Sequence, residues 1–174
     1  MTVSSAYREK RQALEAIWAR AGGGDEELRR HSLAVDELIV ESYAKVAGLD
    51  RHGDVALVAL GGYGREELFP ASDVDLMILY RAELGEAIGR IADGVLYPLW
   101  DSGLEVGHGV RTLEESMAHA GEDYFFLVAL LDARLIDGSR ELFAELLDTY
   151  GRLFIEGRRE EFVEKMKVHR DSRR

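Results

Sequence analysis

The stretch GGYGREELFPASDVDL, residues 61–76, decides the fold. It follows the apolar run VALVAL at 55–60 and leads into LMILY at 76–80. Short continuous apolar runs that are rich in β-branched residues are typical of strands buried on both faces. The sequence therefore predicts two buried strands, 55–60 and 73–80, joined by a glycine-rich loop and a second loop at Pro70 and Ser72.

Asp73 and Asp75 lie two residues apart at the start of the second strand. Side chains two apart in a strand share a face, and their Cα atoms lie roughly 6.6 Å apart at about 3.3 Å per residue. Two such carboxylates repel each other unless a cation lies between them. Their hard oxygens suit Mg²⁺ or Mn²⁺ rather than zinc. The pair indicates a divalent-cation site, although Asp-x-Asp also occurs at turns with no function.

Gly61, Gly62 and Gly64 follow the first strand. Glycine permits positive φ and lets another group approach the backbone, and consecutive N–H groups in such a turn can bind an anion. The spacing matches neither the Walker A loop nor the dinucleotide-binding fingerprint. The eleven positions from Gly62 to Asp73 allow a short helix and a return to a neighbouring strand, so glycines and acids are expected side by side. Arg65 would then lie near a bound phosphate.

A third carboxylate usually completes a site in which two metal ions lie roughly 3.5–4 Å apart. We expect Glu105, on a third strand at 104–112, to supply it, with Asp101 as the rival. Together these parts indicate phosphoryl chemistry on a nucleotide. His108 fits either a structural histidine or a nucleotide contact, and Arg111 is expected near the site.

The remaining segments follow helical periodicity. We expect the fold class α+β: a small mixed sheet flanked by N-terminal helices and a C-terminal helical segment. Thr112 and Glu115 fit a capping box, and Phe125 and Phe126 fit helix packing rather than base stacking. The expected helices are 6–20, 25–47, 84–100, 113–120, 123–134, 139–150 and 153–168. The expected parts are N-terminal helices at 1–50, a core at 51–120 and a helical extension at 121–174, truncated from a longer chain.

The amino-acid composition excludes several classes of partner and of site. The 174-residue chain has 33 acids against 22 Lys plus Arg, a net charge of −11, which argues against DNA or RNA as partners. There is no cysteine, so disulfides and thiolate metal sites are excluded. The first residues lack the apolar run of a signal peptide, and no stretch reaches the roughly 20 apolar residues of a membrane span. We expect a cytoplasmic protein with no membrane partner.

The pattern GGYGR, ELFP and SDVDL resembles the nucleotidyltransferase signature of the DNA polymerase β-like superfamily. In this form it is similar to the N-terminal catalytic domain of the bifunctional PII uridylyltransferase/uridylyl-removing enzymes. The segments WDSGLEVGHGVRT at 100–112 and LLDARLIDGSRELF at 130–143 resemble the same family, so the resemblance covers about residues 55–145.

The resemblance implies transfer of UMP from UTP to a tyrosine hydroxyl of the PII signalling protein, with Mg²⁺. It implies that Gly61 and Gly62 hold the triphosphate and that Asp73 and Asp75 bind metal. We also expect Gly64, Arg65 and Ser72 to contact the nucleotide. Two alternatives stay open: a similar domain of a CBS or cyclic-nucleotide sensor protein with an unknown acceptor, and a catalytically silent nucleotide-binding module.

Overall fold

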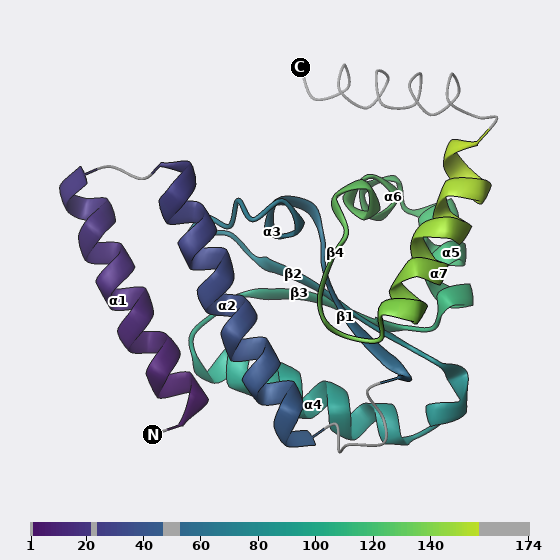
Figure 1. Ribbon diagram of the computed structural model, residues 1–174, viewed down its shortest axis with the longest axis horizontal. Helices are drawn as coiled ribbons and strands as arrows, with labels where there is room; N and C mark the ends of the chain where they lie inside the picture. Colours follow the sequence, from purple (N-terminus) through teal and green to yellow (C-terminus); the bar gives the residue numbers. More distant parts are fainter. Residues whose placement is uncertain (1, 22–23, 47–52, 157–174) are drawn as a thin grey trace.

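The computed structural model describes residues 2–21, 24–46 and 53–156. They form a mixed four-stranded sheet with helices on both faces (Figure 1). The strands are β1 (Val55–Ala59), β2 (Val74–Tyr80), β3 (Val106–Arg111) and β4 (Arg134–Gly138). The α-helices are α1 (Val3–Ala21), α2 (Asp25–Val46), α3 (Gly61–Gly64), α4 (Ala87–Asp101), α5 (Leu113–Glu122), α6 (Tyr124–Ala129) and α7 (Arg140–Tyr150). Two 3₁₀ turns, Ala82–Leu84 and Leu130–Asp132, and a π-helical turn, Gly151–Ile155, complete the order.

The sheet has the order β3-β2-β1-β4. Strand β1 is antiparallel to both β2 and β4, whereas β2 is parallel to β3. The direct β1–β2 connection carries the glycine helix α3, and the β2–β3 crossover carries α4. This confirms the expected α+β class with a small mixed sheet of the polymerase β-like type.

Each face of the sheet is covered by its own helices. Side chains alternate along a strand, so β1 contributes Leu57 to one apolar core and Val58 to the other. The first core packs against α2 and α4, and the second packs against α5, α6 and α7. Figure 1 shows α1 beside α2 at one end of the molecule and α5 to α7 at the other. Asp75 shares a face with Met77, so it lies on the α5–α7 side.

Local sequence signals explain several helix starts. Thr112 and Glu115 form the expected capping box, in which each side chain bonds the other's backbone N–H. Asp123 caps α6 by accepting from the N–H groups of Phe125 and Phe126. Ser139 accepts from Leu142 N and caps α7.

The expected helix over 123–134 is wrong at its C-terminal end. Helix α6 ends at Ala129, and Arg134 begins β4, which pairs with β1 from Ala56 to Ala59. Strand pairing therefore overrides the helical pattern here. The expected helix at 153–168 lies largely outside the described residues. None of the helices in the described ranges is long and apolar enough to cross a membrane.

Candidate active site

Asp75 lies where three backbone segments meet. It is on β2 opposite Gly107 of β3, and its main-chain oxygen accepts a hydrogen bond from Leu60 N at 3.0 Å. A Cβ placed on Gly107 would be 2.7 Å from Asp75 Oδ1, and one on Gly61 would be 3.5 Å from Oδ2. The carboxylate thus occupies the space that two glycines leave open.

The glycines themselves form α3, a single helical turn that begins immediately after β1. Gly61 has a φ of +54°, which glycine adopts without strain. A Cβ on Gly64 would overlap the carbonyl oxygen of Asp132 and lie 3.1 Å from that of Ala59, so only glycine fits. The first N–H groups of a helical turn have no acceptor within it, which leaves them available to a ligand. The structure therefore brings the glycine turn and the acidic pair together, as the sequence predicted.

The negative charges of Asp73 and Asp75 repel each other. Burial raises the pKa of the Asp75 carboxyl, and the nearby Asp73 carboxylate raises it further. Within the described part of the chain, neither carboxylate has an ion-pair or side-chain hydrogen-bond partner. Two close carboxylates without a cationic partner favour the binding of a cation, because a cation reduces their mutual repulsion.

These residues fit a divalent metal ion. Carboxylate oxygens are the donors that Mg²⁺ and Mn²⁺ prefer, and Asp73 and Asp75 supply them at the open end of a strand. The described residues contain no group of three or more His, Asp or Glu side chains arranged to hold an ion. Glu105 is exposed immediately before β3, and its carbonyl accepts from Val74 N at 2.8 Å. Its backbone is therefore next to that of Asp73, but its role as third ligand stays a prediction.

The other predicted nucleotide contacts lie around the same turn. Arg65 is exposed, and its guanidinium is held by Glu67 at 2.7 Å and Asp132 at 2.6 Å. Binding a phosphate would require Arg65 to exchange these carboxylates for it. Ser72 is exposed in the loop before Asp73, and its N–H donates to Phe69 O at 3.0 Å. Both roles stay predictions.

A cavity of about 330 Å³ opens beside Asp75. This is within the volume range of small-molecule sites. Its lining comes from the end of β1, from β2 and β3, and from α5 and α6 with the residue between them: Leu60, Asp75, Leu76, Met77, Gly107, His108, Gly109, Arg111, His119, Asp123, Phe125, Phe126 and Ala129. Sequence reasoning placed Arg111 near the site and left His108 open between a structural role and a nucleotide contact; both residues line the cavity.

Phe125 and Phe126 line the same cavity, which sequence reasoning missed. Phe125 lines the cavity with a side chain that is 57% exposed. Phe126 lies under the Arg111 guanidinium, 5.3 Å from ring centre to Cζ. The sequence carries no local signal for this placement, because the cavity forms between α6 and strands from other parts of the chain.

A partly buried ionic network braces the glycine turn from the other side. Asp36 of α2 accepts from Tyr63 Oη at 2.5 Å and forms an ion pair with Arg134 of β4 at 2.8 Å. Arg134 also donates to the carbonyl oxygen of Gly64 at 3.2 Å. Burial and then the Asp36 charge raise the pKa of Tyr63 well above its usual value, so its hydroxyl remains a donor. The network joins α2, α3 and β4 and fixes the turn beside Asp75.

The sequence of this chain is similar to those of known proteins. The profile of the nucleotidyltransferase domain matches residues 46–172. A bifunctional uridylyltransferase/uridylyl-removing enzyme of Thiobacillus denitrificans is 40% identical over 153 residues, which is 88% of this chain and 16% of that protein. Proteins of the same name are 46% identical over 114 residues in Cupriavidus pinatubonensis and 42% identical over 100 residues in Streptomyces coelicolor. Those matches cover 65% and 58% of this chain and 13% and 12% of the relatives.

The chain thus spans about one sixth or less of the length of these relatives. The matched region contains all four strands, the glycine turn and both aspartates. From these matches and this geometry, the chain belongs to the nucleotidyltransferase domain family.

Proposed function

We propose that the chain is the nucleotidyltransferase domain of a uridylyltransferase, which transfers UMP from UTP to a tyrosine hydroxyl of the PII nitrogen-regulatory protein. The names of the relatives support uridylyl transfer. The observation that carries the proposed chemistry is the position of the Asp75 carboxylate between Gly61 and Gly107. Asp73 lies nearby, and in the described part of the chain no cationic side chain pairs with Asp75.

Each part of the site has a role in this reaction. Asp73 and Asp75 would hold Mg²⁺ or Mn²⁺, with Glu105 as the proposed third ligand. Bound there, a divalent ion neutralises charge on the triphosphate and makes an acceptor hydroxyl more nucleophilic. The N–H groups of the glycine turn at Gly61 and Gly62 bind phosphate oxygens and hold the α-phosphorus near the acids.

The covalent step is a substitution at the α-phosphorus of UTP. The acceptor oxygen forms a bond to that phosphorus, and the bond from the phosphorus to the α,β-bridging oxygen breaks. Pyrophosphate leaves with the bonding electrons, and the hydroxyl proton is lost to a carboxylate of the site. The cavity between the sheet and α5–α6 is open to the surface, so an acceptor side chain of another protein can reach Asp75.

A transfer assay tests the proposal. The chain is incubated with purified PII, Mg²⁺ and UTP labelled at the α-phosphate, with Asp75→Asn and a chelator as controls. Label should appear on PII only with the wild-type chain and the metal, and a PII variant with phenylalanine at the modified tyrosine should stay unlabelled. Bound UTP without transfer to PII would contradict the proposal and favour the silent nucleotide-binding module. Transfer to another acceptor only would favour the sensor-protein alternative.

A further inference from the structure

Arg111, the last residue of β3, folds back across the sheet instead of extending away from it. A Cβ on Gly109 would overlap the Arg111 guanidinium, so the side chain lies over the glycine two positions earlier. The guanidinium also lies over the ring of Phe126 from α6. A glycine in the strand and an aromatic ring opposite it therefore hold this cation inside the cavity.

No carboxylate neutralises Arg111 within the described residues, and this sets it apart from the arginines around it. Arg65 is paired with Glu67 and Asp132, and Arg134 is paired with Asp36. The Arg111 guanidinium instead lies over the Phe126 ring. Asp123, another acid of the cavity wall, already accepts from two backbone N–H groups as the cap of α6.

The cavity consequently has two ends of opposite charge. Asp75 lies opposite Gly107, and Gly109 lies two residues further along β3, roughly 6.6 Å away at about 3.3 Å per residue. Side chains of alternate residues share a face, so Asp75, Gly107, Gly109 and Arg111 all face the cavity. A polyphosphate that begins at the acids can extend along β3 toward the guanidinium, which lies over Gly109.

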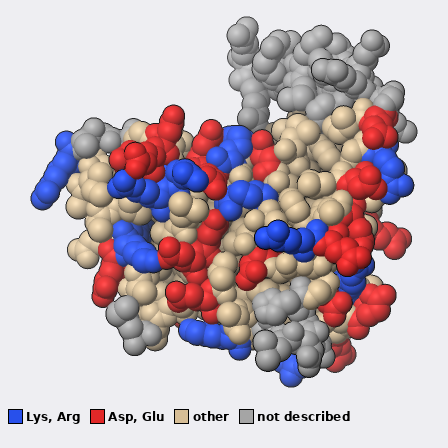
Figure 2. Space-filling view, viewed as in Figure 1, with Lys and Arg blue, Asp and Glu red and all other residues tan. Residues whose placement is uncertain are grey.

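We propose that Arg111 binds the β- and γ-phosphates of the nucleotide and stabilises the pyrophosphate that leaves. This inference rests on the proposed function and adds the residue that holds the polyphosphate tail. A guanidinium presents a planar fork of donors that matches two phosphate oxygens. The chain carries a net charge of −11, and on the face shown in Figure 2 acidic side chains are interspersed with basic ones. A triphosphate therefore needs a local cation of this kind.

Isothermal titration of the chain tests this assignment with three ligands: UTP with Mg²⁺, inorganic tripolyphosphate with Mg²⁺, and uridine. Arg111→Gln should weaken UTP and tripolyphosphate about 10- to 100-fold, because charge-assisted hydrogen bonds are lost, and should leave uridine unchanged. Arg111→Lys keeps the charge without the fork and should give a smaller loss. Gly109→Ala keeps Arg111 but displaces its guanidinium, so it should also weaken both polyphosphates.

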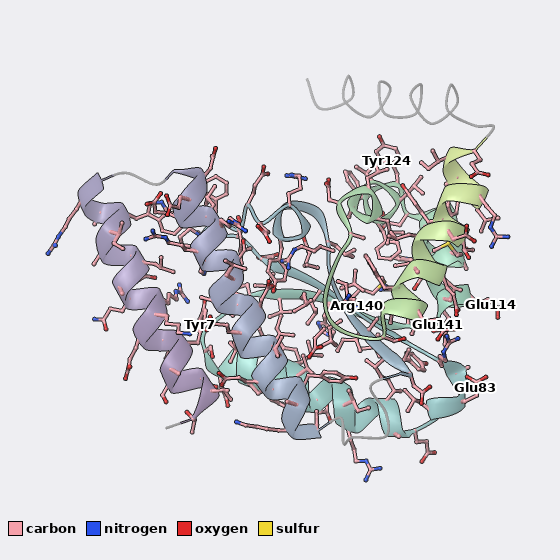
Figure 3. All side chains as sticks on the ribbon, viewed as in Figure 1. Tyr7, Glu83, Glu114, Tyr124, Arg140 and Glu141 are labelled. Atoms are coloured by element: carbon pink, nitrogen blue, oxygen red, sulfur yellow. The ribbon has the colours of Figure 1, made fainter. Side chains whose placement is uncertain are left out.

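Arg140→Gln is the matched control. Arg140 is an exposed arginine at the start of α7, and Figure 3 shows it well apart from Tyr124 at the start of α6. Its substitution should change none of the three affinities. Thermal unfolding of each variant verifies the fold, and Gly109→Ala and Arg111→Lys carry the test if Arg111→Gln does not fold.

The outcomes separate this inference from the proposed function. Wild-type affinity for UTP and tripolyphosphate in Arg111→Gln or Gly109→Ala would overturn the assignment while leaving UMP transfer intact. An equal loss of uridine would also overturn it, because Arg111 would then act on the nucleoside or the fold. A wild-type chain that binds neither UTP nor tripolyphosphate would refute both claims together.

Discussion

Asp75 and Gly107 face each other across the parallel strands β2 and β3, and the glycine leaves the space that the Asp75 carboxylate occupies. A Cβ at position 107 would lie 2.7 Å from Asp75 Oδ1. A glycine within a strand often marks a close approach by another group. Here that group is the carboxylate on which the proposed chemistry depends.

Gly107→Ala should therefore reduce activity more than stability. The new methyl group would push the carboxylate away from its position, and a small misplacement of a catalytic group can cost on the order of 10²-fold in rate. We expect UMP transfer to fall about 10- to 100-fold, with thermal unfolding changed little because the neighbour is a side chain that can rotate. Normal turnover in this variant would show that the position of Asp75 is not critical.

Gly64→Ala should have the opposite profile and destabilise the fold. Its Cβ would overlap the backbone oxygen of Asp132, which cannot move as a side chain can. Overpacking of this kind costs roughly 1–3 kcal/mol of unfolding free energy. Gly62→Ala is the control for stability, because its Cβ would meet its nearest atom at 3.7 Å, an ordinary contact. Equal unfolding free energies for the two variants, measured in urea, would refute this account of the turn.

The ion pair between Asp36 and Arg134 should contribute to stability more than a surface pair does. Its side chains are 14% and 24% exposed, and removing one partner leaves a largely buried charge. A double-mutant cycle with Asp36→Asn and Arg134→Gln should give a coupling free energy of about 1–3 kcal/mol. The same cycle on Arg29 and Glu66, where Arg29 is 64% exposed, should give less than about 1 kcal/mol. A coupling no larger than that control would refute the bracing role.

His31 should make stability depend on pH. Its ring contacts Leu68 O and Tyr7 Oη, both at 3.0 Å, and a neutral ring satisfies both when Nδ1 donates and Nε2 accepts. Burial lowers the pKa of His31 below its usual 6.5, an effect that the Leu68 hydrogen bond partly opposes. Below about pH 6.5 the unfolded chain thus takes up a proton that the folded chain does not, and stability is lost as the pH falls.

Thermal unfolding between pH 7.5 and 5.5 measures this effect. The wild-type melting temperature should fall over that range, and His31→Gln should be less stable at pH 7.5 but less sensitive to pH. If His31→Gln and the wild type show the same slope, His31 does not titrate as its burial implies.

Much of the site follows from sequence, because the informative features are local. Buried apolar strands, a glycine turn between them and an Asp-x-Asp at the head of the second strand placed Gly61 beside Asp75. The capping box at Thr112 was equally local. These features depend on a few neighbouring residues and on the alternation of strand side chains.

The parts that sequence reasoning missed depend on contacts between distant segments. Strand β4 lies where we expected the end of one helix and the connection to the next, and it forms because it pairs with β1. Arg134 reaches Asp36 across 98 positions, and Arg111 reaches Phe126 from a different element. No local sequence pattern predicts such contacts. Gly109 offered a partial signal, since a second glycine within one strand implies that something lies over it.

We propose that Asp73 and Asp75 hold the cation that the nucleotide and the transfer reaction need. The most direct test of this claim is calorimetric titration of UTP into the wild type, Asp73→Asn and Asp75→Asn, each with and without Mg²⁺. Wild-type affinity for UTP should rise with Mg²⁺, and each variant should lose that rise and slow UMP transfer on the order of 10²- to 10³-fold, since a bound metal ion contributes several kcal/mol. A variant that keeps both its Mg²⁺-dependent affinity and its turnover would contradict the claim.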